Sequence, residues 1–399
     1  MLKDLLKLSK KGPIFLLFLY NLTGLTFVIG PVMIPFLTQT AHITTKQAMR
    51  LTSLYLITTT IAEIPTGVIA DRYGKKISLI LCELFFFLGG IIFAFTQNLS
   101  FFFIAEILWG TARAFYSGAY EAFEYDTVES IGLKDDYLKI SGYSTTFGLI
   151  GMLLSNVLNF ILLKLGASLK LLMIISSLGF LLTIPLFLII KERKDAKKQE
   201  FIPNYLEIIK TSLINMKKDK LLQKIAIWTL FAQIISYSGF FFTQPILTDI
   251  KAPLLWFGIF ETVMQTIRIL WVNIIPKMYK RFKFLKAFNI IITTLSTILI
   301  TSIIFFYKGY IQLTTISLVI FFALLVDMHN LGNQILQDRI KSNVRSTTLS
   351  FISLIRTLVI SALSMLFSYI SPNALIFFST IFFLSIIILV AVSLNLKEV

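Results

Sequence analysis

Long apolar runs separated by short charged segments dominate the chain. Each run is close to the roughly twenty residues that an α-helix needs to cross about 30 Å of hydrocarbon. The runs do not alternate over about ten residues, as barrel strands would. The pattern therefore predicts an all-α polytopic membrane protein. It indicates twelve transmembrane helices in two sets of six, at about 13–38, 46–70, 76–96, 99–123, 138–163, 169–190, 224–247, 253–276, 285–307, 311–334, 347–370 and 373–395.

The longest polar stretch separates the two sets of runs and opens with the basic segment Lys191 to Lys198. We therefore expect a six-helix bundle over 1–190, a cytoplasmic linker over 191–223 and a second six-helix bundle over 224–399. The equal numbers of helices indicate two pseudo-repeats, an arrangement typical of transporters. The basic segment 276–283 occupies the place in the second repeat that residues 67–76 occupy in the first, and it is expected to be a loop.

Composition supports a membrane protein and excludes several other classes. The chain is 56% hydrophobic and only 15% charged, with a mean hydropathy of +0.82. A soluble protein of this size could not bury so much apolar surface, so the lipid bilayer is the expected environment. The many phenylalanines are expected to face lipid.

The net charge of +16 does not indicate a nucleic-acid partner, because the basic residues fall mainly in alternate loops. That asymmetry follows the positive-inside rule and predicts a plasma (inner) membrane protein with both termini in the cytoplasm. Arg113, Arg268 and Arg356 lie within predicted spans. The basic residues that fall on the opposite, outer side are Lys46, Arg50, Lys164, Lys170, Lys251 and Lys308.

No pattern of an enzyme, a metal site or a cofactor site is present. Cys82 is the one cysteine and there are two histidines, which excludes a multi-cysteine or His-rich metal centre. The sequence has no phosphate-binding loop, no His-Glu-x-x-His and no nucleophile elbow. We therefore expect no catalytic residues, no cofactor and no metal, and a chain that acts as a monomer on a small-molecule solute.

The charged turn between the second and third spans carries the clearest local signal. Gly67 allows close helix approach and Gly74 allows a turn with positive φ. Lys75 and Lys76 begin the third helix, where they oppose its dipole. Attraction to lipid headgroups is the expected reason for both lysines, which leaves Asp71 available for a positive partner. The alternative is a surface turn whose charges only set the topology.

Three stretches together resemble the major facilitator superfamily, in a bacterial branch with many exporter-like members. They are Glu63 to Lys76, Gly110 to Asp126, and Asp338 to Ser350. The resemblance implies twelve helices in two bundles and a latch that closes between the halves in the outward-open state. In that latch Asp71 meets Arg345 and the start of the eleventh span, and Asp126 joins the network. The implied latch residues are Gly67, Asp71, Arg72, Gly74, Lys75, Lys76, Asp126 and Arg345.

Ionisable residues inside the spans supply candidates for proton coupling or for the substrate cavity. Such groups cost about 2.5–3.5 kcal/mol in hydrocarbon and usually pair or line a cavity. Glu63 and Arg113 lie at comparable depths and are the first candidate pair. Arg113 also resembles the family's fourth-span arginine, which is associated with proton coupling, although a structural ion pair is the alternative. The candidates are Glu63, Arg113, Glu121, Glu261, Arg268, Asp327, Asn330 and Arg356.

The sequence therefore predicts a secondary transporter that works by alternating access. Proton-coupled export of a drug-like compound or metabolite is preferred, with Glu63 or Asp327 as the titrating carboxylate. A proton-coupled uptake symporter is the first alternative. A non-transporting receptor or scaffold on the same fold is the second, which the intact turn at 67–76 disfavours.

Overall fold

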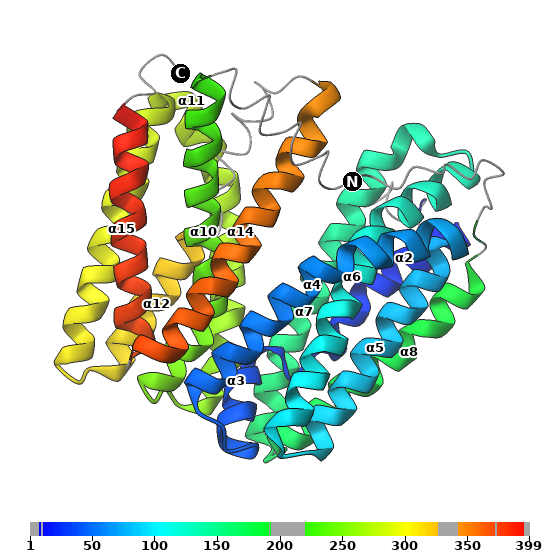
Figure 1. Cartoon of the computed structure of the whole chain (residues 1–399), viewed down its shortest axis with the longest axis horizontal. Coiled ribbons are helices and arrows are strands. Elements are labelled where there is room, and N and C mark those ends of the chain that lie inside the picture. Colours follow the sequence, from blue (N-terminus) through cyan, green and yellow to red (C-terminus); the bar gives the residue numbers. More distant parts are fainter. Residues whose placement is uncertain are drawn as a thin grey trace. The chain divides into compact units, whose positions relative to one another are not determined.

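Helices make up almost all of the chain described by the computed structural model, and no strand occurs in that part (Figure 1). The described residues are 8, 11–190, 192, 220–325, 342–371 and 373–394, with side chains at 220–222 and 342–350 and at several positions of 269–287 left out. These residues form two compact units. The first unit contains 1–44 and 51–202, and the second contains 45–50 and 203–399.

The first unit begins with a broken span. Helix α2 (Gly12–Leu22) passes into the 3-10 turns η1 (Thr23–Thr26) and η2 (Gly30–Val32), the short α3 (Met33–Pro35) and the π-turn η3 (Phe36–Thr40). Two buried side chains satisfy backbone groups at the break: Asn159 donates to the Val28 carbonyl at 2.8 Å, and Ser176 accepts from the Ile29 N–H at 3.0 Å. Such partners are what a non-helical segment at membrane depth requires.

The rest of the first unit is built from long helices. They are α4 (Thr45–Tyr73), of which residues 45–50 belong to the second unit, α5 (Lys75–Phe95), α6 (Leu99–Ser130), the turn η4 (Lys134–Asp136), α7 (Tyr137–Lys164) and α8 (Leu169–Ile189). Asn98 and Ser168 accept backbone N–H groups at the starts of α6 and α8, as N-cap residues do.

Small residues let these helices approach closely. A Cβ on Gly110 would lie 2.8 Å from the Tyr55 carbonyl, and one on Gly151 would lie 2.8 Å from the Leu22 carbonyl. Such contacts between backbones are typical of membrane helix pairs.

The second unit contains α10 (Lys220–Asp249), α11 (Leu254–Tyr307), α12 (Ile311–Leu325), α14 (Ser342–Ile370) and α15 (Ala374–Leu394). Helix α11 has 54 residues, about 80 Å if it were straight. Figure 1 shows that it bends back on itself, so that both ends of the helix lie at the same end of the unit. Residues 276–283 lie within its helical backbone, so the loop expected there is wrong: this basic segment forms a helical bend.

Aromatic side chains fill the core of the second unit. Phe321, Phe322, Phe378 and Phe382 are buried and contact one another edge to face, tilted or stacked. The expectation that phenylalanines mostly face lipid is therefore wrong for this cluster. Helices α12 and α15, which carry these four residues, contain no glycine, and their large rings fill the space between the helices.

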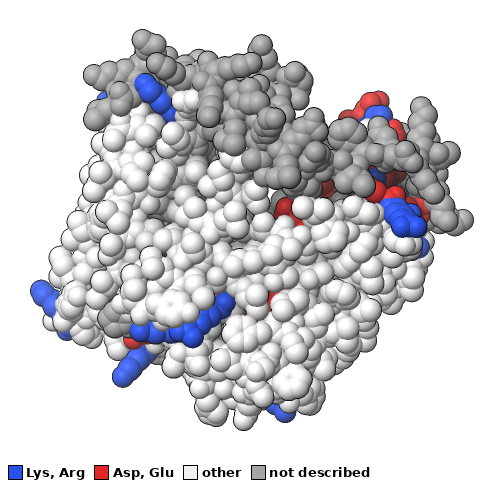
Figure 2. Space-filling model, viewed as in Figure 1, with Lys and Arg blue, Asp and Glu red and all other residues white. Residues whose placement is uncertain are grey.

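Nine helical segments in the described part are long and apolar enough to cross a membrane. The three other predicted spans fall on α6, on the first limb of α11 and on α12, whose described part ends at Leu325. In Figure 2 the visible side chains over the middle of the helices are almost all uncharged, and charged residues collect near helix ends. Both observations fit a multi-pass membrane protein.

Candidate functional site: a charged turn and membrane-embedded arginines

The turn between α4 and α5 consists of a single residue. Helix α4 ends at Tyr73, α5 begins at Lys75, and Gly74 between them has a φ of +106°. L-residues rarely adopt this conformation. The positive φ predicted for Gly74 is confirmed.

Glu192 closes this turn from across the unit. Its carboxylate accepts the backbone N–H of Lys75 at 2.6 Å, and a Cβ on Gly74 would lie 2.6 Å from its Oε2 atom. A carboxylate at a helix N-terminus satisfies an unpaired N–H and interacts favourably with the helix dipole. Sequence reasoning missed Glu192, and the one available signal was an acidic residue within a mainly basic stretch that also contains Asp195.

The two lysines that follow Gly74 at the start of α5 both bind protein groups. The Lys75 ammonium forms an ion pair with Asp126 near the end of α6. The Lys76 ammonium donates to the carbonyls of Leu188 and Ile190 at 2.8 and 3.0 Å, at the C-terminus of α8. A cation there complements the negative end of the helix dipole. Headgroup attraction is therefore not needed to explain these lysines, and the turn ties α4, α5, α6 and α8 together.

Asp71 is exposed and forms no ion pair with a side chain that the structure describes. Arg72 is also exposed and its guanidinium lies 5.4 Å from the centre of the Tyr73 ring. The side chain of Arg345 lies outside the described residues, so the expected contact with Asp71 stays a prediction. A Cβ on Gly118 would lie 3.9 Å from the Cα of Gly67, which places these two glycines close together.

Arg113 of the first unit stands at one end of a row of tyrosines. Its guanidinium lies 5.2 Å from the ring centre of Tyr116, which is stacked on Tyr120 at 5.0 Å. Asn21 donates to the Tyr120 hydroxyl at 2.5 Å. The ion pairs of the described residues do not include Glu63–Arg113, so that expected pair is not formed in this structure. Equal depth on two helices does not make their side chains face each other.

The most deeply buried carboxylates of the first unit are not the ones that the sequence favoured. Glu83 of α5 is 4% exposed and accepts the Tyr20 hydroxyl at 2.9 Å. Glu106 of α6 is 6% exposed. Glu63 and Glu121, by contrast, are exposed. Glu83 and Glu106 stand out as charges in apolar runs, but the sequence alone did not separate buried from exposed positions.

A second arginine–tyrosine contact lies within the second unit. The Arg356 guanidinium of α14 lies 4.0 Å from the ring centre of Tyr237 on α10. It also donates to Ser353 Oγ at 2.7 Å and to Gln233 Oε1 at 3.5 Å. The sequence did not single out Tyr237, because its partner is more than a hundred residues away.

The other candidates of the second unit are placed only in part. Arg268 contacts Gln265 at 3.5 Å, and its charge is close enough to act on Glu261 of the same helix. Asp327 and Asn330 lie outside the described residues.

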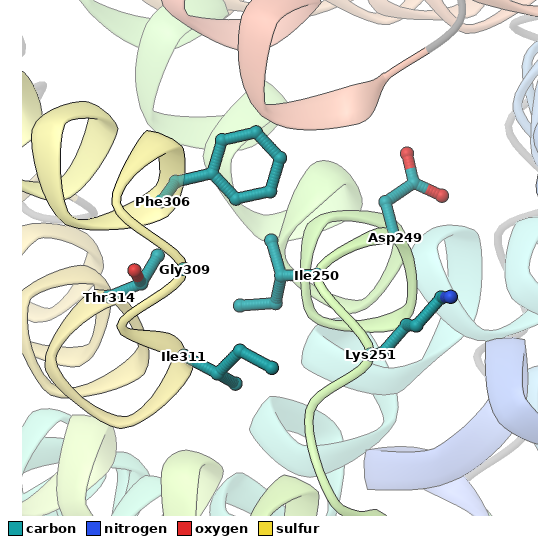
Figure 3. A pocket seen from close by; sticks show the side chains of 7 residues that line it. All are labelled: Asp249, Ile250, Lys251, Phe306, Gly309, Ile311 and Thr314. Carbon is teal, nitrogen blue, oxygen red and sulfur yellow. The ribbon is translucent and has the colours of Figure 1, made fainter.

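A cavity of about 270 Å³ opens at one end of the second unit. Asp249, Ile250, Lys251, Phe306, Gly309, Ile311 and Thr314 line it. Figure 3 shows apolar side chains around the space, while the charged tips of Asp249 and Lys251 point away from it. The cavity is therefore a weak candidate for a site that binds a polar solute. Within the described residues no group of His, Cys, Asp and Glu side chains could hold a metal ion.

These observations define a multi-pass helical membrane protein with two helical units, a braced charged turn and charges inside its spans. The sequence model of the Major Facilitator Superfamily matches residues 15–365. The chain belongs to this family and has its twelve-helix fold, and it is accordingly a transporter and not an enzyme.

Several known proteins are similar to this chain. An uncharacterized MFS-type transporter of Bacillus subtilis (strain 168), YxaM, is 31% identical over 98 residues, a quarter of either chain. The nucleoside transporter NupG aligns with a TM-score of 0.73 at 13% identity, covering 96% of this chain and 99% of that one. A POT family peptide transporter gives 0.70 at 12% identity and 97% coverage of both. A D-xylose–proton symporter gives 0.67 at 13% identity, covering 94% and 96%. At these identities the solved structures support the fold alone.

Proposed function

We propose that this chain is a secondary active transporter that moves a small organic solute by alternating access, with proton-coupled export as the preferred mode. The observation that carries the proposal is that each unit holds an arginine within a span, lying over a tyrosine ring: Arg113 over Tyr116 and Arg356 over Tyr237. Charges in hydrocarbon are costly, and in transporters they commonly mark solute or proton pathways.

The arginine–tyrosine contacts favour a solute that has an acidic group, an aromatic ring or both. Guanidinium groups bind carboxylates and phosphates through paired hydrogen bonds. Tyrosine rings stack on other rings and leave a hydroxyl for hydrogen bonding. Each of the two contacts offers such a solute both a cation and an aromatic face.

Buried carboxylates support proton coupling. Glu83 and Glu106 are nine-tenths or more buried inside spans, where carboxylates are commonly parts of proton relays. The exposed Glu63 and Glu121, together with Glu261 and the undescribed Asp327, remain in the proposal as alternative carriers.

The proposed location is the plasma (inner) membrane with both termini in the cytoplasm. The charge asymmetry of the loops supports this orientation, which places the Gly74 turn inside and the α10–α11 connection outside. The protein is proposed to act as a monomer.

Flux in reconstituted vesicles tests the proposal. A thermal-shift screen of aromatic and acidic metabolites first selects a solute. We expect a pH gradient to increase its flux about tenfold, the increase to disappear when a protonophore collapses the gradient, and Glu83→Gln to abolish it. Glu129→Gln, a surface carboxylate, is the control. A flux that does not change with the pH gradient would refute proton coupling. The direction of net flux distinguishes export from uptake. If no solute is transported, the receptor alternative is favoured.

The latch is proposed together with this function. We expect Asp71→Asn to weaken a contact with the start of α14 and to shift the resting population toward the inward-open state, by about five- to tenfold. Distance measurements between spin labels on the inner ends of the two units report that population. Asp135→Asn, on the same inner surface, is the control. Unchanged distances in Asp71→Asn would leave the charges of the turn without a latch role.

A further inference from the structure

The cavity of the second unit is an apolar space with charge only at its mouth. It lies where α10 ends and where α11 turns into α12. Figure 3 shows Ile250, Phe306 and Ile311 around the space. Its volume of about 270 Å³ is roughly nine times the share of one water molecule in the liquid. Apolar walls make hydrocarbon a more favourable occupant of this space than water.

The backbone turns on either side of the cavity are built alike but use different residues. In each turn one N–H donates to the carbonyl three residues before it, and the next N–H donates to the carbonyl five residues before its own position. This pattern ends a helix with one residue in the left-handed region, which is usually glycine. After α11 that residue is Gly309, with a φ of +75°, but after α10 it is Lys251, with a φ of +58°.

Lysine at this position is unfavourable for the backbone, because an L-residue with positive φ brings its Cβ close to the following carbonyl oxygen. Gly166 fills the same place after α7, with a φ of +85°. The backbone would therefore be better served by glycine at position 251 as well. We infer that the side chain of Lys251, and not its conformation, accounts for its presence.

Topology does not account for the cations at the mouth either. Lys251 and Lys308 are both exposed, and Lys308 directly precedes Gly309. Both are on the side that the loop charges assign to the outside, where basic residues are rare in this sequence. Asp249 does not neutralise the cavity, because its carboxylate points away from it and accepts the Ala374 N–H at 2.7 Å.

Two tyrosines indicate the depth of the mouth in the membrane. Tyr307 and Tyr310, on either side of Lys308 and Gly309, are 70% and 54% exposed. Exposed tyrosines in a membrane protein are typical of the interface between hydrocarbon and water. At that depth a lysine meets the phosphate groups of lipids.

We propose that this cavity binds one acyl chain of an anionic phospholipid of the outer leaflet, whose phosphate lies on Lys251 and Lys308. Charge complementarity selects this occupant, since the walls are apolar and the mouth is cationic. The Lys251 ammonium points away from the cavity (Figure 3), as such a ligand requires, because its charge stays outside while its chain is inside. The proposal takes the outer leaflet from the orientation given under the proposed function, and it does not depend on transport.

A lipid titration of the detergent-purified protein, followed by native mass spectrometry, tests the site. We expect one long-chain phosphatidylglycerol to bind at least about tenfold more tightly than phosphatidylcholine, and Lys251→Gly and Lys308→Gln each to weaken it about fivefold. Ile311→Trp, which places a larger side chain in the cavity, should abolish tight binding. Lys164→Gln, at the equivalent end of α7, is the matched control and should bind as the parent does.

Lys251→Gly also separates the lipid site from protein stability. Because glycine suits a φ of +58°, this variant should melt no lower than the parent in lipid-free detergent, although it binds the lipid less well. Equal affinity in the parent, Lys251→Gly and Lys308→Gln would overturn the proposal. Equal affinity for phosphatidylcholine and phosphatidylglycerol, or equal weakening in Lys164→Gln, would also overturn it.

The acyl chain has its own test. The deacylated headgroup, glycerophosphoglycerol, should not bind measurably, because burial of the chain supplies most of the affinity. Headgroup binding as tight as that of the whole lipid would show that the cavity takes no chain. If Ile311→Trp does not fold, Thr314→Leu, which enlarges another lining residue, replaces it. The titration needs neither solute nor gradient, so a failed flux assay together with lipid binding would reject the transport proposal and keep the lipid site.

Discussion

Gly74→Ala is expected to lower stability and to abolish most transport. Gly74 has a φ of +106° and a ψ of 149°, a conformation that costs a non-glycine residue about 1–3 kcal/mol. The added Cβ would also lie 2.6 Å from Glu192 Oε2, so the carboxylate that caps α5 must move. We expect the melting temperature in detergent to fall by about 2–4 °C and transport to fall at least about tenfold.

Two other glycines separate the causes of that loss. Gly132 has a φ of +73°, and a Cβ added there would meet nothing within 4 Å, so Gly132→Ala should show only the backbone cost, about 1 kcal/mol. Gly67 belongs to the same motif as Gly74, but it is helical and its Cβ would also meet nothing within 4 Å. Gly67→Ala should therefore retain full stability. A normal melting temperature in Gly74→Ala would show that Glu192 does not brace the turn.

The fold was predictable because the bilayer restricts the choices. Only helices and closed barrels satisfy every backbone group in hydrocarbon, and apolar runs of about twenty residues fit helices, so the runs could be read directly as spans. The turn at Gly74 was predictable for a similar reason, since Asp71 to Lys76 is too polar to span and glycine permits the reversal. The loop expected at 276–283 failed because its charges were taken as a break, although helical backbone can continue through a charged bend.

The side-chain partners of the site were much less predictable. Glu192 meets the N–H of Lys75 across 117 positions, and hydropathy holds no information about which faces of α5 and α8 meet. The expected Glu63–Arg113 pair failed for the same reason, because depth along a helix does not determine direction around it. Arg113 instead stacks on Tyr116, three positions on, which is a local contact that helical spacing does allow.

Exchanging the charges of Lys75 and Asp126 gives the second large expected effect. The pair is largely shielded, with side chains 27% and 19% exposed, so its coupling should be about 1–3 kcal/mol. Lys75→Asp alone places a carboxylate beside Asp126 and near Glu192, and Asp126→Lys alone places two ammonium groups together. We expect either single change to reduce transport about tenfold and to lower the melting temperature.

The double variant Lys75→Asp/Asp126→Lys should recover at least about half of both losses, because the attraction between positions 75 and 126 is restored. The exposed pair Lys134–Glu129, with side chains 59% and 32% exposed, is the matched control, and its exchange should change little because solvent-exposed pairs are weak. Failure of the double variant to recover would mean that Lys75 acts through its position at the start of α5 and not through Asp126. Full recovery of stability without recovery of transport would separate the two roles of the turn: the ion pair would hold α5 against α6, and the cation at position 75 itself would be required for the change of state.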